Sequence, residues 1–164
     1  MSDKHYNVLF ICTHNSARSI MAEGLMGQLG GGRFTAYSAG SHPADQVNPL
    51  ALKTLQVLGV APREYRSKDW SEFARPDAPR LDFVFTVCDK AAGEVCPLWP
   101  GQPMSAHWGV ADPAAIEGTE AQKEKVFWDA GMILRRRIEL MLALPLEALD
   151  SLTIQREIEA IGKQ

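Results

Sequence analysis

Residues 6–19 read YNVLFICTHNSARS and fall into three parts. Residues 6–11 form an almost continuous apolar run with β-branched and aromatic side chains, which is typical of a strand buried on both faces. Small polar residues follow this run, and from Arg18 onwards apolar side chains recur at helical spacing. A buried strand, a short polar loop and a helix in this order predict an α/β fold.

The rest of the chain continues the alternation of strands and helices. Further strands are expected at residues 34–39, 81–87 and 104–108. Helices are expected from residue 18 to the glycines at 30–32, from residue 49 to Gly59, from a capping box at residues 119–122 to Pro145, and in a last stretch to about residue 161. The pattern predicts one α/β domain with a four-stranded, mainly parallel sheet and helices on both faces.

Composition limits the classes of function that the chain can have. The chain has 164 residues, of which 46% are hydrophobic and 23% charged, as in a globular domain. Its 20 acidic and 17 basic residues give a net charge of -3, which argues against a general nucleic-acid binder or a binder of anionic membranes. No apolar run approaches the roughly 20 residues that span a bilayer.

The chain has three cysteines, Cys12, Cys88 and Cys96. An odd, small number is not a secreted disulfide framework, so we expect a cytoplasmic protein whose thiols are buried, metal-bound or reactive. Three cysteines cannot form a four-cysteine zinc site, and no close Cys or His spacing supports a mixed site. We therefore expect no metal and no organic cofactor.

Two of the cysteines directly follow predicted strands. Cys12 follows the strand at residues 6–11, and Cys88 follows the strand at residues 81–87. Ligand sites in open parallel sheets form beyond the carboxyl ends of the strands. We therefore expect Cys12 and Cys88 to lie close together, although 76 positions separate them in sequence.

The loop after Cys12 is predicted to bind an oxyanion. Its backbone N–H groups and the following helix N-terminus can face an anion, and the Arg18 guanidinium suits a tetrahedral oxyanion. The same positive field is expected to lower the pKa of Cys12 and make it a nucleophilic thiolate, with Ser19 as a further hydrogen-bond donor. The alternative is a buried structural cysteine beside an unrelated arginine.

Asp112 is a candidate general acid. It follows the predicted strand at residues 104–108 and can reach the same edge of the sheet. A leaving oxygen needs a proton, and a nearby carboxyl group can supply one. An Asp-Pro pair alone would be an ordinary turn, so this role depends on Cys12 being nearby.

Several segments, in order along residues 6–143, resemble the low-molecular-weight tyrosine phosphatase superfamily, and most closely its arsenate reductase branch. These segments are Cys12-x5-Arg18-Ser19, Met21-Ala22-Glu23-Gly24, Tyr37-Ser38-Ala39-Gly40, His107-Trp108-Gly109 and Asp112-Pro113. The resemblance implies a flavodoxin-like, three-layer domain over residues 1–143. Residues 144–164 would then be a helical extension that packs on this domain or at an interface.

The resemblance also implies a function and a set of site residues. Phosphatases of this family usually carry aromatic residues after the Asp-Pro pair, where this chain has Ala114 and Ala115, and the reductases carry two further cysteines, here Cys88 and Cys96. The implied reaction is reduction of arsenate through a disulfide relay. The oxyanion would lie in the loop formed by Thr13, His14, Asn15, Ser16, Ala17, Arg18 and Ser19.

The resemblance leaves the electron donor and the reaction class open. Thioredoxin is the expected donor, with glutaredoxin and glutathione as the alternative, because the seven residues between Cys88 and Cys96 are slightly more than in some thioredoxin-coupled relatives. One alternative function is hydrolysis of phosphotyrosine or a small phosphoester through a phosphocysteine. Another is a non-catalytic module that binds oxyanions or senses thiols.

Overall fold

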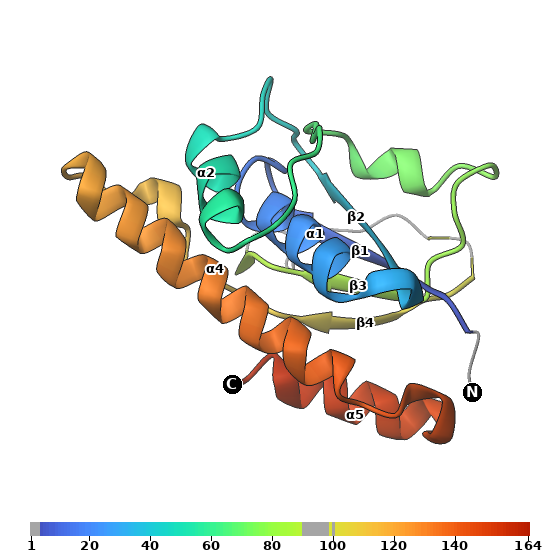
Figure 1. Cartoon of the computed structure of the whole chain (residues 1–164). Coiled ribbons are helices and arrows are strands. Elements are labelled where there is room, and N and C mark those ends of the chain that lie inside the picture. The colour runs from blue at the N-terminus through green and yellow to red at the C-terminus, as the bar shows by residue number, and fades with distance from the viewer. Residues whose placement is uncertain (1–3, 90–98, 100) are drawn as a thin grey trace.

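A computed structural model describes residues 4–89, 99 and 101–164 (Figure 1). Four parallel strands form one sheet in the order β2-β1-β3-β4. The strands are β1 (Tyr6–Cys12), β2 (Phe34–Gly40), β3 (Phe83–Thr86) and β4 (Met104–His107). The predicted fold class, a single α/β domain with a four-stranded parallel sheet, is confirmed.

The described helices vary from one turn to 23 residues. The α-helices are α1 (Arg18–Leu29), α2 (Pro49–Val57), α4 (Glu120–Leu142) and α5 (Ser151–Ile161), and the 3-10 helices are η1 (Gly31–Arg33), η2 (Trp70–Phe73), η3 (Pro113–Ala115) and η4 (Leu146–Ala148). In Figure 1, α1 lies in front of the strands, α2 packs on its outer side, and α4 and α5 run along the side of β4.

Aromatic side chains pack together on the face of the sheet beneath α1. Phe10 of β1 stacks on Phe85 of β3, with 5.7 Å between ring centroids, and Phe85 stacks on Trp108 at 3.8 Å. All three side chains are fully buried. This core fixes the positions of β1 and β3 relative to each other, because neighbouring residues in the register, such as Phe10 and Phe85, pack side by side.

The opposite face of the sheet contacts η2. Tyr37, on β2, points away from α1, and its ring centroid lies 5.4 Å from that of Phe73 in η2. Gly40 at the end of β2 also forms a parallel bridge with Asp69, just before η2. The segment that leads into η2 is thereby held beside the carboxyl end of the sheet.

Local signals set the ends of the helices as expected. The Asn48 side chain accepts a hydrogen bond from Leu50 N at the start of α2, and Thr119 and Gln122 form the predicted capping box of α4. Gly31 and Gly59 have φ values of 58° and 85° after α1 and α2, a conformation that glycine adopts without steric cost. The third strand is shorter than expected because Leu81 and Val87 are buried without belonging to the paired segment.

Residues after α4 fold back onto the sheet. The indole Nε1 of Trp108 donates a hydrogen bond of 2.9 Å to the carbonyl of Ile158 in α5. Ile154, Ile158 and Ile161 are buried in the same core as the strands. The described helices include none long and apolar enough to cross a membrane.

Candidate active site

The loop between β1 and α1 turns its carbonyl groups outward. The carbonyl oxygens of Thr13, His14 and Ser16 accept backbone hydrogen bonds from His42, Ala44 and Asn48, at 2.8, 2.9 and 2.9 Å. The Asn15 carbonyl accepts a bond of 2.6 Å from the Ser67 hydroxyl. Four successive carbonyls are therefore occupied on the outer side. Carbonyl groups engaged in this way can leave N–H groups on the other side of the loop, which is what an anion site needs.

Asn15 holds the shape of the loop. It is fully buried and adopts a left-handed conformation with φ of 48°. Its amide nitrogen donates to the hydroxyls of Ser19 at 2.8 Å and Ser38 at 2.9 Å, and its amide oxygen accepts from the backbone N–H of Lys68 at 3.0 Å. One side chain therefore connects the loop to α1, to β2 and to the segment before η2.

A buried charged group supports this network. The Ser38 hydroxyl donates a 2.5 Å hydrogen bond to Glu23 Oε1, and Lys68 Nζ lies 3.7 Å from the same oxygen. Arg63 contacts the other carboxylate oxygen at 3.3 Å. Burial lowers the pKa of Lys68, and the Glu23 carboxylate opposes this shift. The two cations compensate the buried Glu23 carboxylate, as a buried charge requires.

The structure brings Cys12 and Cys88 together at the carboxyl edge of the sheet, as the sequence predicted. Their exposed fractions are 5% and 2%, and the two thiols share a hydrogen bond. The Thr13 hydroxyl lies 3.4 Å from Cys88 Sγ. No disulfide joins Cys12 to Cys88.

The prediction of a lowered pKa for Cys12 is wrong for this geometry. The hydrogen bond with Cys88 raises the pKa of the Cys12 thiol well above its ordinary value, and burial raises it further. The Arg18 charge and the backbone N–H of Thr13 lower the pKa, but they do not outweigh the other two causes. Cys12 therefore rests as a thiol while it contacts Cys88.

Arg18 and Asp112 meet beside the loop. Arg18 begins α1 and donates a hydrogen bond of 2.9 Å to the Val110 carbonyl, and its second nitrogen lies 3.9 Å from Asp112 Oδ2. The other Asp112 oxygen accepts from the Ala114 N–H and caps η3. The Asp112 side chain is 46% exposed, so it lies at the mouth of the site.

The remaining predicted residues occupy different places around the loop. His14 is exposed, and its Nδ1 bonds to the His42 carbonyl at 3.0 Å. Ser19 is buried, and its hydroxyl accepts a hydrogen bond from the Asn15 amide. Ala17 is buried, and its carbonyl begins the hydrogen bonding of α1. Cys96 lies outside the described residues.

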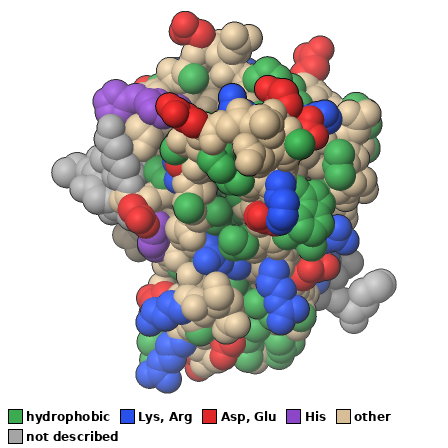
Figure 2. Space-filling model, turned by 90° about the vertical axis from the view of Figure 1, so that its left-hand side faces the viewer, with side chains coloured by type: hydrophobic (Ala, Val, Ile, Leu, Met, Phe, Trp, Pro, Cys, Tyr) green, Lys and Arg blue, Asp and Glu red, His purple; other side chains and the backbone are tan. Residues whose placement is uncertain are grey.

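Figure 2 views the molecule from the left-hand side of Figure 1, where the strands end and α1 begins. Histidine side chains are exposed at the upper left of this face, and Lys and Arg side chains lie over its middle and lower part. Asp and Glu side chains are interspersed among them, so this face carries charges of both signs.

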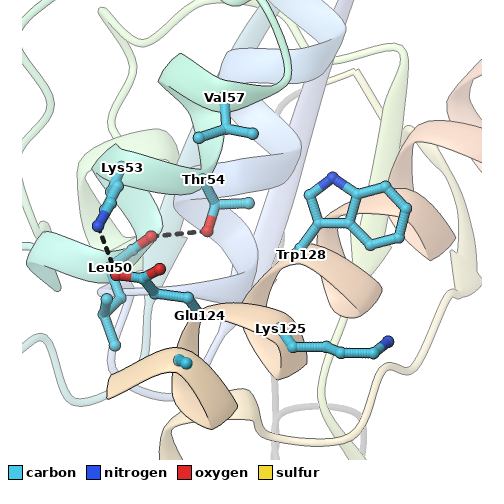
Figure 3. A pocket seen from close by; sticks show the side chains of 8 residues that line it. Leu50, Lys53, Thr54, Val57, Glu124, Lys125 and Trp128 are labelled. Atoms are coloured by element: carbon cyan, nitrogen blue, oxygen red, sulfur yellow. Dashed lines mark hydrogen bonds and ion pairs between the residues drawn. The ribbon is translucent and has the colours of Figure 1, made fainter.

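A separate groove of about 400 Å³ lies between α2 and α4 (Figure 3). Val57 and Trp128 form apolar parts of its wall, and an ion pair between Lys53 and Glu124 crosses it. None of the predicted site residues lines this groove. Within residues 4–89, 99 and 101–164, no group of three or more His, Cys, Asp and Glu side chains is placed to hold a metal ion.

The sequence did not identify Lys68 and Ser67 as site residues. Lys68 is 53 positions and Ser67 is 52 positions from Asn15, which both contact. Glu23, Ser38 and Gly40 belong to the segments that carry the family resemblance, but no role followed from their spacing. The one signal available was polarity at positions where strand or helix periodicity predicts a buried side chain, as at Glu23 and Ser38.

The chain is similar to known proteins in sequence and in fold. A family model described as low molecular weight phosphotyrosine protein phosphatase matches residues 7–147. A protein of Halalkalibacterium halodurans named arsenate reductase is 40% identical over 120 residues, which are 73% of this chain and 83% of the relative.

Solved structures are similar over most of the chain. A structure titled as an arsenate reductase in oxidized state is 26% identical, with a TM-score of 0.67, and the match covers 84% of this chain and 96% of the other. A thioredoxin-dependent arsenate reductase of Corynebacterium glutamicum is 26% identical, with a TM-score of 0.57. That match covers 85% of this chain and 65% of the other.

Proposed function

Because the family model spans residues 7–147, the chain belongs to the low molecular weight phosphotyrosine protein phosphatase family, and we propose that within it the protein is an arsenate reductase. The observation that carries the proposal is the Cys88 thiol, hydrogen-bonded to Cys12 beside an anion-binding loop. A phosphatase needs one nucleophilic thiol, whereas a reductase needs a second thiol within reach of the first. The names of the relatives described above support the same assignment.

The first step is attack of the Cys12 sulfur on arsenic. The inward N–H groups of the loop and the Arg18 guanidinium bind the arsenate oxygens. Because the pKa of Cys12 is raised, its proton must leave first, and the arsenate dianion can accept it. An S–As bond forms, an As–O bond breaks, and Asp112 protonates the departing oxygen, which leaves as water.

The second step reduces arsenic. The Cys88 thiol loses its proton and attacks the Cys12 sulfur, so an S–S bond forms and the S–As bond breaks. The electron pair of the broken bond stays on arsenic, which passes from As(V) to As(III) and leaves as arsenite. Two thiols are oxidised to one disulfide for each arsenate reduced.

The disulfide must then be reduced by an external dithiol. We assign Cys96 the role of attacking Cys88, which releases Cys12 and forms a Cys88–Cys96 disulfide. Thioredoxin is the proposed donor, because one structural neighbour is a thioredoxin-dependent enzyme. Glutaredoxin with glutathione is the alternative donor, and a reducing compartment such as the cytoplasm suits both. Arsenate turnover with each purified donor system distinguishes them.

The Cys88→Ser variant tests the proposed function. We expect arsenite production from arsenate to be lost, because the S–As bond is no longer broken by a neighbouring thiol. Hydrolysis of para-nitrophenyl phosphate by the same variant should persist, because Cys12, Arg18 and Asp112 remain. Unaltered arsenate turnover in Cys88→Ser would contradict the relay.

The family relationship also makes phosphoester hydrolysis the competing function. In that case Cys12, Arg18 and Asp112 would act through a phosphocysteine that water hydrolyses. The two alanines after Pro113 favour the reductase, since Ala114 and Ala115 offer no ring to hold a phosphotyrosine. Arsenate turnover that is absent with every donor, together with rapid hydrolysis of phosphotyrosine, would favour the phosphatase.

A further inference from the structure

The His107 imidazole, at the end of β4, is hydrogen-bonded through both of its nitrogens. Its Nδ1 lies 2.8 Å from the Thr86 hydroxyl, and its Nε2 lies 2.7 Å from Asp89 Oδ1. Thr86 ends β3, and Asp89 follows Cys88 directly. The ring therefore holds the chain on both sides of Cys88.

One tautomer of the neutral ring satisfies both contacts. A carboxylate only accepts hydrogen bonds, so the Nε2–H group of His107 donates to Asp89. In a neutral imidazole the other nitrogen is then an acceptor, and the Thr86 hydroxyl can donate to it. Both hydrogen bonds are made without a net charge on the ring.

The neighbouring backbone leaves room for this pair. A Cβ atom on Gly109 would lie 2.5 Å from His107 Nε2 and 3.0 Å from Asp89 Oδ1. The Gly109 carbonyl in turn accepts a hydrogen bond of 2.9 Å from Arg137 of α4. Any other residue at position 109 would place its Cβ where the His107–Asp89 hydrogen bond lies.

The hydrogen bonds of the Cys88 thiol with the loop are weak. A thiol is a weak donor and a weak acceptor, and the contact with Thr13 Oγ1 is 3.4 Å long. Backbone hydrogen bonds place Val87, whose N–H donates to the Ile11 carbonyl at 2.8 Å and whose carbonyl accepts from Val110 at 3.0 Å. The bond between Asp89 and His107 secures the chain on the other side of Cys88.

We propose that His107 is a positioning residue that sets where the Cys88 sulfur lies relative to Cys12, by holding Thr86 and Asp89 on either side of it. Its importance for turnover rests on the proposed thiol relay. Its effect on the distance between the two thiols is independent of arsenate and can be measured without it.

Glutathione redox buffers measure this effect in a Cys96→Ser background, which keeps Cys12 and Cys88 as the cysteines of the chain. Oxidation of the pair forms one S–S bond and reduces one glutathione disulfide to two glutathione molecules. The equilibrium constant therefore reports the effective concentration of one thiol at the other. We expect His107→Ala to lower this equilibrium constant about tenfold or more, because a small displacement of one thiol strongly reduces its effective concentration at the other.

A conservative variant separates positioning from general stability. The amide of His107→Gln can donate to Asp89 and accept from Thr86, so this variant should restore most of the equilibrium constant. Asp89→Ala should act in the same direction as His107→Ala. The two changes together should cost less than the sum of their separate effects, since both remove the hydrogen bond between His107 and Asp89.

His5→Ala is the matched control. Both nitrogens of His5 are also hydrogen-bonded, to the Gly32 carbonyl at 2.9 Å and the Thr35 hydroxyl at 2.6 Å, but at the opposite end of the sheet. This variant should leave the glutathione equilibrium unchanged.

An unchanged equilibrium constant in folded His107→Ala protein, or an equal fall in His5→Ala, would overturn the assignment. A fall that is specific to His107, in a protein that does not reduce arsenate, would support the positioning role and count against the proposed activity.

Discussion

The pKa of Cys12 is raised chiefly by its hydrogen bond with the Cys88 thiol. Cys88→Ala removes that bond while Arg18 and the Thr13 N–H remain, so we expect the pKa of Cys12 to fall. The rate of alkylation by iodoacetamide against pH gives this pKa, and the Cys96→Ser protein serves as background and reference. A pKa of Cys12 that stays the same or rises would mean that burial, rather than Cys88, keeps the proton on the sulfur.

Asn15 combines a left-handed backbone with three buried hydrogen bonds. Asn15→Ala loses the bonds and strains the backbone, whereas Asn15→Gly loses the bonds alone. We expect Asn15→Ala to lower the free energy of unfolding by about 2–4 kcal/mol, as measured by urea denaturation. The loss in Asn15→Gly should be smaller than this by about 1 kcal/mol. Equal losses in the two variants would show that the left-handed backbone carries no strain.

At the scale of elements, the end of β2 lies directly against the loop between β1 and α1. This loop, residues 13–17, is the proposed anion loop. A Cβ on Gly40 would lie 2.5 Å from the Thr13 carbonyl oxygen and 2.7 Å from that of Cys12, and both are backbone atoms. Gly40→Ala should therefore displace the loop and weaken phosphate binding by about tenfold or more, as measured by calorimetry.

Gly32→Ala is the control for this prediction. A Cβ on Gly32 would meet no atom within 4 Å, and this glycine lies outside the anion loop. Phosphate binding should be unchanged in this variant. Equal binding by Gly40→Ala and Gly32→Ala would show that the loop does not depend on close contact with β2.

The elements of the fold were predictable where their signals are local. Asn48 and Thr119 act on backbone groups two or three positions away, so the starts of α2 and α4 could be read directly from the sequence. The third strand was predicted too long because apolar character indicates burial and does not mark the ends of a strand. Leu81 and Val87 are buried beside a strand that runs only from 83 to 86.

The candidate site was predictable in part. Each cysteine directly follows a predicted strand, and with the carboxyl-edge rule this was enough to predict Cys12 near Cys88. The ionisation of Cys12 was predicted wrongly because it depends on which group its sulfur contacts and on how deeply it is buried. Lys68 was missed because its contact with Asn15 depends on how the chain between them folds.

At the scale of the whole molecule, the residues after α4 pack into the common core. We expect one cooperative unfolding transition for the entire chain, detected equally by tryptophan fluorescence and circular dichroism. Ile158→Ala should lower the free energy of unfolding by about 2–5 kcal/mol, because Ile158 is fully buried and its carbonyl binds Trp108.

Leu152→Ala in the same helix is the control, since Leu152 is 61% exposed and its loss should cost little. Two separate transitions, with Ile158→Ala shifting only one of them, would show that residues 144–164 fold as an independent unit.

The hydrogen bonds that the carbonyl groups of the anion loop accept make the shape of the loop depend on complete folding. Their donors are His42, Ala44, Asn48 and Ser67, which reach the loop only after the chain from β2 to η2 has docked. A growing or partly melted chain would carry the same Cys12 but no shaped receptor for an oxyanion. Selective reactivity towards tetrahedral anions is thus acquired late, as a property of the finished native state.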